Sequence, residues 1–188
     1  DLNNFYASVE RKLNPSLSGK PVAVCGNREE RHGIVLAKSE EAKKCGIKTG
    51  DTVWQAQKKC KDLVIVPPRF GLYIEYSKRV RAGYARYTDL IESYGIDECW
   101  LDVTKSTLLF AAYGGEKYTV EDGVKYYSDG FLRHLGDEIR NAVKEDVGVT
   151  VSCGVSFNKV YAKLGSDLKK PDGTSGISKL RYKQIIYA

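Results

Sequence analysis

The spacing of apolar residues divides the first part of the chain into short helices and strands. Apolar residues over 5–13 recur at helical spacing, so we expect a helix there, followed by a loop over 14–19 rich in Ser, with Pro and Gly. The apolar stretches 20–25 and 33–37 are typical of buried strands. A further strand is expected at 63–66, where Pro67 and Pro68 end it.

Helix-capping residues mark two helices between these strands. Ser39 is a good N-cap, and the acidic residues that follow it suit the positive end of a helix dipole. Gly46 is expected to end that helix. Asp51 or Thr52 can cap the next helix, which runs to about Cys60.

The second half of the chain predicts longer elements. A helical pattern covers 70–87, and the stretch 91–103 indicates two extended halves that meet near Asp97. We then expect a helix over 120–144, a β-branched strand over 149–155, a helix over 158–168, a loop over 169–173 and a weakly helical tail.

This order of elements predicts an α+β fold. When 11–68 is set aside as an insertion, the remainder reads strand, helix, strand, strand, helix, strand, which is the split arrangement of ferredoxin-like domains. We therefore expect an antiparallel sheet with helices on one face, and a small α/β insertion. The first strand of that sheet would lie just before Asp1 and end on it.

Composition narrows the class of protein. With 188 residues, 42% of them hydrophobic, the chain can bury one substantial core with a smaller appended lobe. A net charge of +6 favours a polyanionic partner such as nucleic acid without establishing one.

The five cysteines and the lack of long apolar runs indicate the compartment. The cysteines are odd in number, scattered and without C-x-x-C spacing, so neither a disulfide framework nor a zinc site is expected. No apolar run approaches the roughly 18 residues that a membrane span needs, and no signal peptide is evident. We expect a soluble, cytoplasmic protein without a membrane partner.

Three acids could form a metal site. In the ferredoxin-like arrangement the first strand neighbours the hairpin, so Asp1, Asp97 and Glu98 can come together at one edge of the sheet. Neighbouring residues of a strand face opposite ways, so Asp97 and Glu98 must lie at a turn or bulge to share a site. Carboxylates suit Mg²⁺, and two such ions would serve phosphoryl transfer. Acid pairs in loops are usually solvated, so the pattern alone leaves a structural role open.

Four stretches of sequence resemble the motif blocks of Y-family DNA polymerases, the translesion enzymes. They are DLNNFYASVE (1–10), YGIDECWLD (94–102), GVSFNKVYAK (154–163) and KPDG (170–173). The resemblance covers nearly the whole chain but is limited to the palm and fingers of that family. It implies a palm over 1–10 and 69–177, fingers over 11–68, and the start of a thumb over 178–188.

The resemblance implies roles for individual residues. Asp1, Asp97 and Glu98 would hold two Mg²⁺ ions, for which Mn²⁺ could substitute, with the Leu2 carbonyl as a further ligand. Asp102 matches a recurrent acid outside this ligand set, and we interpret it as structural.

Nucleotide-binding roles follow from the same resemblance. Tyr6 matches an aromatic steric gate that excludes a ribose 2′-hydroxyl, and Phe5 would be its packing neighbour in the nucleotide site. Lys170 matches a lysine that binds the triphosphate as a point charge. Lys159 and Lys163 share a helix face, and we expect both to be exposed to solvent.

The fingers motif departs from the family pattern. Many relatives have Tyr and Arg where this chain has Glu40 and Lys43. Lys43 can supply the charge for the triphosphate but lacks the bidentate fork of Arg, and Glu40 would repel phosphates.

The function implied is template-directed DNA synthesis of the translesion type, in DNA repair and the DNA-damage response. The partners would be primer–template DNA and a dNTP. A sliding clamp would be a further partner, bound through C-terminal regions that lie outside the palm and fingers. Two alternatives stay open: a nucleotide cyclase with the same palm, and a non-enzymatic, basic nucleic-acid-binding module.

Overall fold

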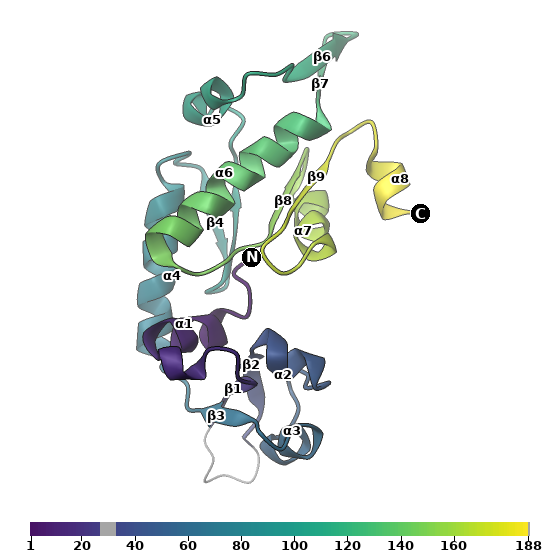
Figure 1. Cartoon of the computed structure of the whole chain (residues 1–188). Coiled ribbons are helices and arrows are strands. Elements are labelled where there is room, and N and C mark those ends of the chain that lie inside the picture. The colour runs from purple at the N-terminus through teal and green to yellow at the C-terminus, as the bar shows by residue number, and fades with distance from the viewer. Residues whose placement is uncertain (27–32, 188) are drawn as a thin grey trace. The chain divides into compact units, whose positions relative to one another are not determined.

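The chain consists of two compact units. The computed structural model describes residues 1–26 and 33–187, and the units comprise Asn4–Ser77 on the one hand and Asp1–Asn3 with Lys78–Ala188 on the other. Figure 1 shows the course of the chain through both units.

The unit of 4–77 is built on a three-stranded sheet in the order β2-β1-β3. Strand β1 pairs antiparallel with β2 and parallel with β3, and α1 contacts both β1 and β2. The elements are α1 (Phe5–Leu13), the 3-10 turn η1 (Pro15–Leu17), β1 (Val22–Cys25), β2 (Val35–Lys38), α2 (Glu40–Lys44), α3 (Val53–Lys59), β3 (Val64–Val66) and the first half of α4 (Phe70–Tyr84).

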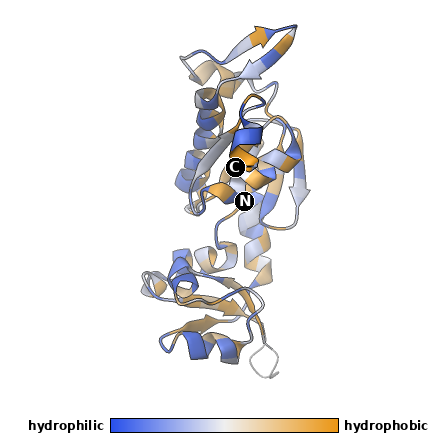
Figure 2. Cartoon of the chain, turned by 90° about the vertical axis from the view of Figure 1, so that its right-hand side faces the viewer, coloured by the Kyte–Doolittle hydropathy of each residue, from blue (hydrophilic) through white to orange (hydrophobic). Residues whose placement is uncertain are grey.

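Local sequence explains these elements. All four residues of β1 are buried, and the strands of this sheet appear as hydrophobic ribbons in Figure 2. Ser39 caps α2 by accepting a hydrogen bond from the Ala42 amide, as predicted. Thr52, rather than Asp51, caps α3, where it forms a capping box with Gln55. The helix predicted over 5–13 is confirmed.

The larger unit holds two helices against a parallel strand pair. Its elements are the second half of α4, β4 (Ile91–Tyr94), β5 (Glu98–Leu101), α5 (Thr107–Ala112), β6 (Tyr118–Glu121), β7 (Val124–Tyr127), α6 (Asp129–Val147), β8 (Cys153–Ser156), α7 (Lys159–Leu168), β9 (Thr174–Ile177) and α8 (Tyr182–Ile186). Strands β8 and β9 are parallel and joined through α7, whereas β4 and β5 form an antiparallel hairpin.

Residues 1–3 join the hairpin to the β8 region. The Leu2 amide donates to the Asp97 carbonyl (2.9 Å), and Leu2 forms an antiparallel bridge with Val151. The Asn3 amide donates to the Thr150 carbonyl at 2.9 Å. These residues therefore take the central position expected for the end of the first strand of a ferredoxin-like sheet.

Helices α6 and α7 lie on opposite faces of β8 and β9. A Cβ built on Gly136 of α6 would meet Val155, whereas a Cβ on Gly154 would meet backbone of α7. Neighbouring strand residues face opposite ways, so the two helices cover different faces of this pair. Helix α7 is the crossover between these two parallel strands, of which β9 was not predicted from the sequence.

A hairpin replaces the first third of the predicted helix over 120–144. Residues 118–127 form β6 and β7, and α6 begins at Asp129, after the N-cap Ser128. Asp122 and Gly123 both have positive φ, at 48° and 75°. An Asp-Gly pair between β-branched and aromatic residues favours a two-residue hairpin turn, so this signal was available in the sequence.

A cavity of about 530 Å³ lies within the larger unit. Apolar side chains of β5, α6 and β8 line most of it, among them Trp100, Phe131 and Val155. Asp1, Glu98 and Lys163 also line it. The cavity therefore adjoins the acids that the sequence singles out.

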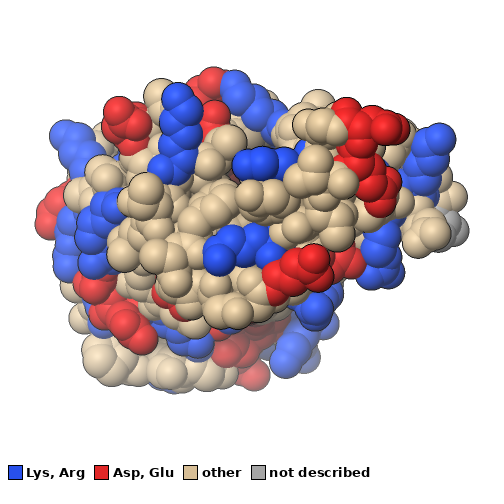
Figure 3. Space-filling model, turned by 90° about the horizontal axis from the view of Figure 1, so that it is seen from above, with Lys and Arg blue, Asp and Glu red and all other residues tan. Residues whose placement is uncertain are grey.

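Surface charge and thiols agree with the composition. On the face seen in Figure 3, basic and acidic side chains are interspersed. All five cysteines are free thiols, as expected. Among the residues described, no helix combines the length and the apolar character that crossing a membrane requires.

Candidate active site

The β4–β5 hairpin places Asp97 and Glu98 at one end of the larger unit's strands. Tyr94 pairs with Glu98, which leaves 95–97 as the turn. Gly95 has a φ of 75°, a conformation that costs glycine little. Asp97 thus lies in the turn, and Glu98 begins β5 directly after it.

Backbone hydrogen bonds hold Asp1 beside this turn. The Ser152 amide donates to the Asp1 carbonyl at 2.8 Å, and the next residue, Leu2, is bonded to the Asp97 carbonyl. The Asp1 side chain is only 10% exposed, and that of Glu98 is 22% exposed. Two carboxylates are therefore largely withdrawn from solvent in the same region.

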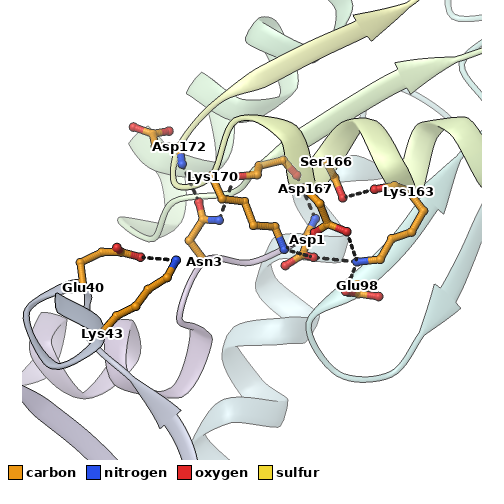
Figure 4. A network of polar contacts seen from close by, with 11 residues as sticks. Asp1, Asn3, Glu40, Lys43, Glu98, Lys163, Ser166, Asp167, Lys170 and Asp172 are labelled. Carbon is orange, nitrogen blue, oxygen red and sulfur yellow. Dashed lines mark hydrogen bonds and ion pairs between the residues drawn. The ribbon is translucent and has the colours of Figure 1, made fainter. Parts of the chain in front are cut away.

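Two lysines neutralise these carboxylates (Figure 4). Lys163 Nζ lies 2.9 Å from Asp1 Oδ2 and 2.5 Å from Glu98 Oε1. Lys170 Nζ lies 2.5 Å from the same Asp1 oxygen and 2.8 Å from Asp167 Oδ1. Burial opposes the charge of Asp167, but the hydrogen bond from Lys170 and the charges of both lysines keep the pKa of Asp167 below its usual range.

The donor set at Asp1 and Glu98 suits a hard cation. Two carboxylate oxygens converge on one ammonium group, so the site already attracts positive charge at that point. Over the described residues, however, no group of three or more His, Cys, Asp or Glu side chains is arranged to hold a metal ion. The structure thus brings Asp1 and Glu98 together but does not gather the Asp97 carboxylate into a three-acid cluster with them.

The 170–173 loop is tied to the start of the chain. Asn3 is buried, its side-chain amide donates to Ser152 Oγ at 2.8 Å, and its side-chain oxygen accepts from the Asp172 amide at 2.8 Å. The Asp172 carboxylate is bound by Arg140 and Lys144. Burial again opposes ionisation, but hydrogen bonds from these two cations hold the pKa of Asp172 below its usual range. This network fixes the loop that carries Lys170.

Tyr6 and Phe5 belong to an aromatic cluster in the unit of 4–77. The Tyr6 ring is half-buried and stacks on Tyr73, with centroids 4.3 Å apart and planes 10° apart. Phe5 is only 3% exposed and lies 5.7 Å from Tyr6, centroid to centroid. The ring of Tyr6 therefore has an accessible side, whereas Phe5 supports it by packing from within the core.

Glu40 is engaged locally. Its Oε1 accepts a hydrogen bond from Asn4 Nδ2 at 2.9 Å and lies 3.8 Å from Lys43 Nζ. The Lys43 side chain is 54% exposed. The Glu40 carboxylate is thus partly neutralised, and Lys43 keeps solvent access.

Comparison with protein families identifies the chain. The model of the impB/mucB/samB family matches residues 1–167, which is most of the chain. This chain belongs to that family.

Curated relatives of this chain are DNA polymerases. The chain is 52% identical over 187 residues to DNA polymerase IV of Acetivibrio thermocellus and 38% identical over 185 residues to DNA polymerase IV 1 of Bacillus subtilis. The two alignments include 100% and 98% of this chain, but only 42% and 39% of the length of the respective relatives. The chain thus spans about two fifths of the length of these curated relatives.

Solved structures confirm the fold. DinB from Sulfolobus solfataricus matches with a TM-score of 0.82 at 28% identity, and an insertion ternary complex of Dbh DNA polymerase matches with 0.82 at 30% identity. Each match covers 99% of this chain and 49% of the other. The resemblance to Y-family polymerases and the α+β class predicted from the sequence are therefore confirmed for this member of the impB/mucB/samB family.

Two polar residues of this site were not recognised from the sequence. Lys163 was expected to be a solvent-exposed residue, yet it contacts both Asp1 and Glu98. Asn3 was not singled out. The alternating charges of Lys163, Asp167 and Lys170 at i, i+4 and i+7 indicated ion pairs along the helix, but not the contacts with Asp1 and Glu98. Asp102 was interpreted as structural; its carboxylate accepts from the Thr104 amide at 3.0 Å.

Proposed function

We propose that this chain carries the catalytic centre of a translesion DNA polymerase, which adds dNTPs to a primer 3′-hydroxyl. The observation that supports the proposal most directly is the convergence of Asp1 and Glu98 on one cationic group in a family whose curated relatives are DNA polymerases. The proposal includes primer–template DNA and a dNTP as partners, and a role in the cytoplasm in the repair of damaged DNA.

Asp1, Asp97 and Glu98 would hold two Mg²⁺ ions, with the Leu2 carbonyl as a further ligand. When bound, these ions supply charge neutralisation for the attacking oxygen and for the leaving pyrophosphate. The partly buried carboxylates of Asp1 and Glu98 support this role, because withdrawn anions bind cations more strongly than exposed ones do. Asp97 lies in the turn directly before Glu98, and the proposal requires its side chain to turn toward the other two acids.

Lys170 and Lys43 would bind the triphosphate. Lys170 is fixed through the Asn3–Asp172 hydrogen bond, so its ammonium group needs no large search to reach a phosphate near Asp1. Lys43 is an exposed point charge, and Glu40 reduces its pull on phosphate through their ion pair. Replacement of Glu40 by Tyr should lower the KM for dNTP, and an unchanged KM would show that Glu40 does not hinder binding.

Tyr6 would act as the steric gate, supported by the buried ring of Phe5. Its stacking on Tyr73 leaves little freedom for the ring, and a rigid ring can exclude a 2′-hydroxyl by contact alone. In domain terms we propose a palm over 1–10 and 69–177, fingers over 11–68, and the start of a thumb over 178–188. A sliding clamp would bind elsewhere in the full-length protein.

The test is primer extension by the full-length protein with Mg²⁺, using dNTPs and rNTPs in parallel. Asp1→Asn and Glu98→Gln should lose most extension, because each removes one charge from the metal site. Tyr6→Ala should gain rNTP incorporation while Tyr6→Phe, which keeps the ring, stays selective. Extension that is indifferent to Asp1→Asn would refute the polymerase proposal, and selective cyclisation of rNTPs would favour the cyclase instead.

A further inference from the structure

Lys163 occupies the point at which the Asp1 and Glu98 carboxylates meet. Its ammonium group contacts both, at 2.9 Å and 2.5 Å, and lies 3.9 Å from Asp167 on its own helix (Figure 4). Lys159, one turn earlier on α7, pairs instead with Glu92, and both side chains of that pair are more than half exposed.

Helix α7 holds Lys163 in place. Gly154 of β8 allows α7 to approach so closely that a Cβ there would lie 1.9 Å from the Ala162 carbonyl oxygen, directly before Lys163 in the chain. Ser166 Oγ donates to the Lys163 carbonyl at 2.8 Å. The Asn158 side chain caps the helix by accepting from the Tyr161 amide. The ammonium group is therefore delivered from a fixed backbone.

This contact offsets the repulsion between the two carboxylates. Like charges in a partly buried region repel, and a cation between them keeps them close. The side chain of Lys163 is one-third exposed, so it can leave this position without unfolding the helix. A divalent cation that binds Asp1 and Glu98 would compete with Lys163 for the same two carboxylates.

We propose that Lys163 is a positioning residue that holds Asp1 and Glu98 together and competes with the divalent cation for them. The inference rests on the proposed function, because it concerns the same two acids. It makes Lys163 a determinant of metal affinity: binding of the ion requires the ammonium group to be displaced from the Asp1 and Glu98 oxygens. Lys170 also contacts Asp1 Oδ2, and that contact too would give way to the ion.

This competition predicts a direction that a merely structural lysine would not give. Replacement of Lys163 by Met removes the competing charge while it keeps most of the side-chain volume. We expect Mn²⁺ to bind Lys163→Met about tenfold more tightly, which corresponds to about 1.4 kcal/mol. Without metal the variant should be less stable than the parent, since Glu98 then loses this cation and Asp1 keeps only that of Lys170. Saturating Mn²⁺ should close that gap.

The experiment measures Mn²⁺ binding by electron paramagnetic resonance, together with thermal unfolding with and without Mn²⁺, on the full-length protein. Lys163→Arg keeps the charge and should bind Mn²⁺ no more tightly than the parent. Lys159→Met is the matched control on the same helix and should leave both readouts unchanged. If Lys163→Met does not fold, Lys163→Gln removes the charge and keeps a hydrogen-bond donor.

The outcomes separate this inference from the proposed function. Asp1→Asn tests the metal site itself: Mn²⁺ binding that ignores this change would overturn both. If Asp1→Asn abolishes binding but the uncharged Lys163 variants bind Mn²⁺ equally or more weakly, the polymerase proposal stands and the competition is refuted. Tighter binding by Lys163→Met, with Lys159→Met unchanged, supports it.

Discussion

Replacement of Gly154 by Ala would test how closely α7 must pack on β8. A Cβ at this position would lie 1.9 Å from the Ala162 carbonyl oxygen and 2.5 Å from the Ser166 amide nitrogen. Both atoms are backbone, so a side-chain rotation cannot relieve the overlap. Helix α7 must move away from β8, and Lys163 must move with it.

The cost follows from the geometry. Overpacking in a well-filled interior costs about 1–3 kcal/mol, and we expect about 3 kcal/mol because backbone has to shift. For a chain of this length, 1 kcal/mol lowers Tm by about 2–4 °C, so Tm should fall by about 6–12 °C. The displacement of the helix should also reduce the influence of Lys163 on the affinity for Mn²⁺, because the ammonium group no longer reaches both acids.

The assay is thermal unfolding followed by circular dichroism, with hydrogen exchange of β8 and α7 to locate the change. Gly71→Ala is a suitable control, since Gly71 is an exposed residue inside α4 with no atom within 4 Å of a built Cβ. That change should stabilise the protein by up to about 1 kcal/mol. Opposite signs for the two substitutions are expected; a Gly154→Ala variant within about 0.5 kcal/mol of the parent would refute the close-packing argument.

Three further predictions follow from buried or paired groups. Asp172→Asn should lower the free energy of unfolding at neutral pH, because the pKa of Asp172 is depressed in the folded state. The stabilisation by the Asp172 carboxylate is present above about pH 4 and is lost as the pH falls through the pKa of the folded state. Urea titrations of parent and variant should therefore converge in acid. Arg69→Ala should cost about 3 kcal/mol in denaturant unfolding, since Glu10 is buried and would lose its cation, whereas a loss under 1 kcal/mol would show that solvent replaces it. A thiol reagent should label the exposed Cys45 well before the buried Cys25, and equal rates would contradict the burial described here.

Local patterns in the sequence determined most of the elements. The helix at 5–13, the caps at Ser39 and Thr52, and the hairpin centred on Asp97 depend on residues within one turn of each other, so their signals survive without tertiary context. The Asp122-Gly123 turn was also readable, but the apolar residues beside it were assigned to the following helix. The motif stretches were sufficient to indicate the family.

Contacts between distant residues were decided only by the tertiary structure. Lys163 and Asp1 are 162 positions apart, and a lysine on an amphipathic helix gives no sign of which acid it will meet. The same holds for the buried Asn3, which ties the start of the chain to Asp172. Helical and strand periods specify which face a residue occupies, but the partner of that face depends on how strands and crossovers pack. The sequence by itself therefore named the acids, and the fold decided which cations they face.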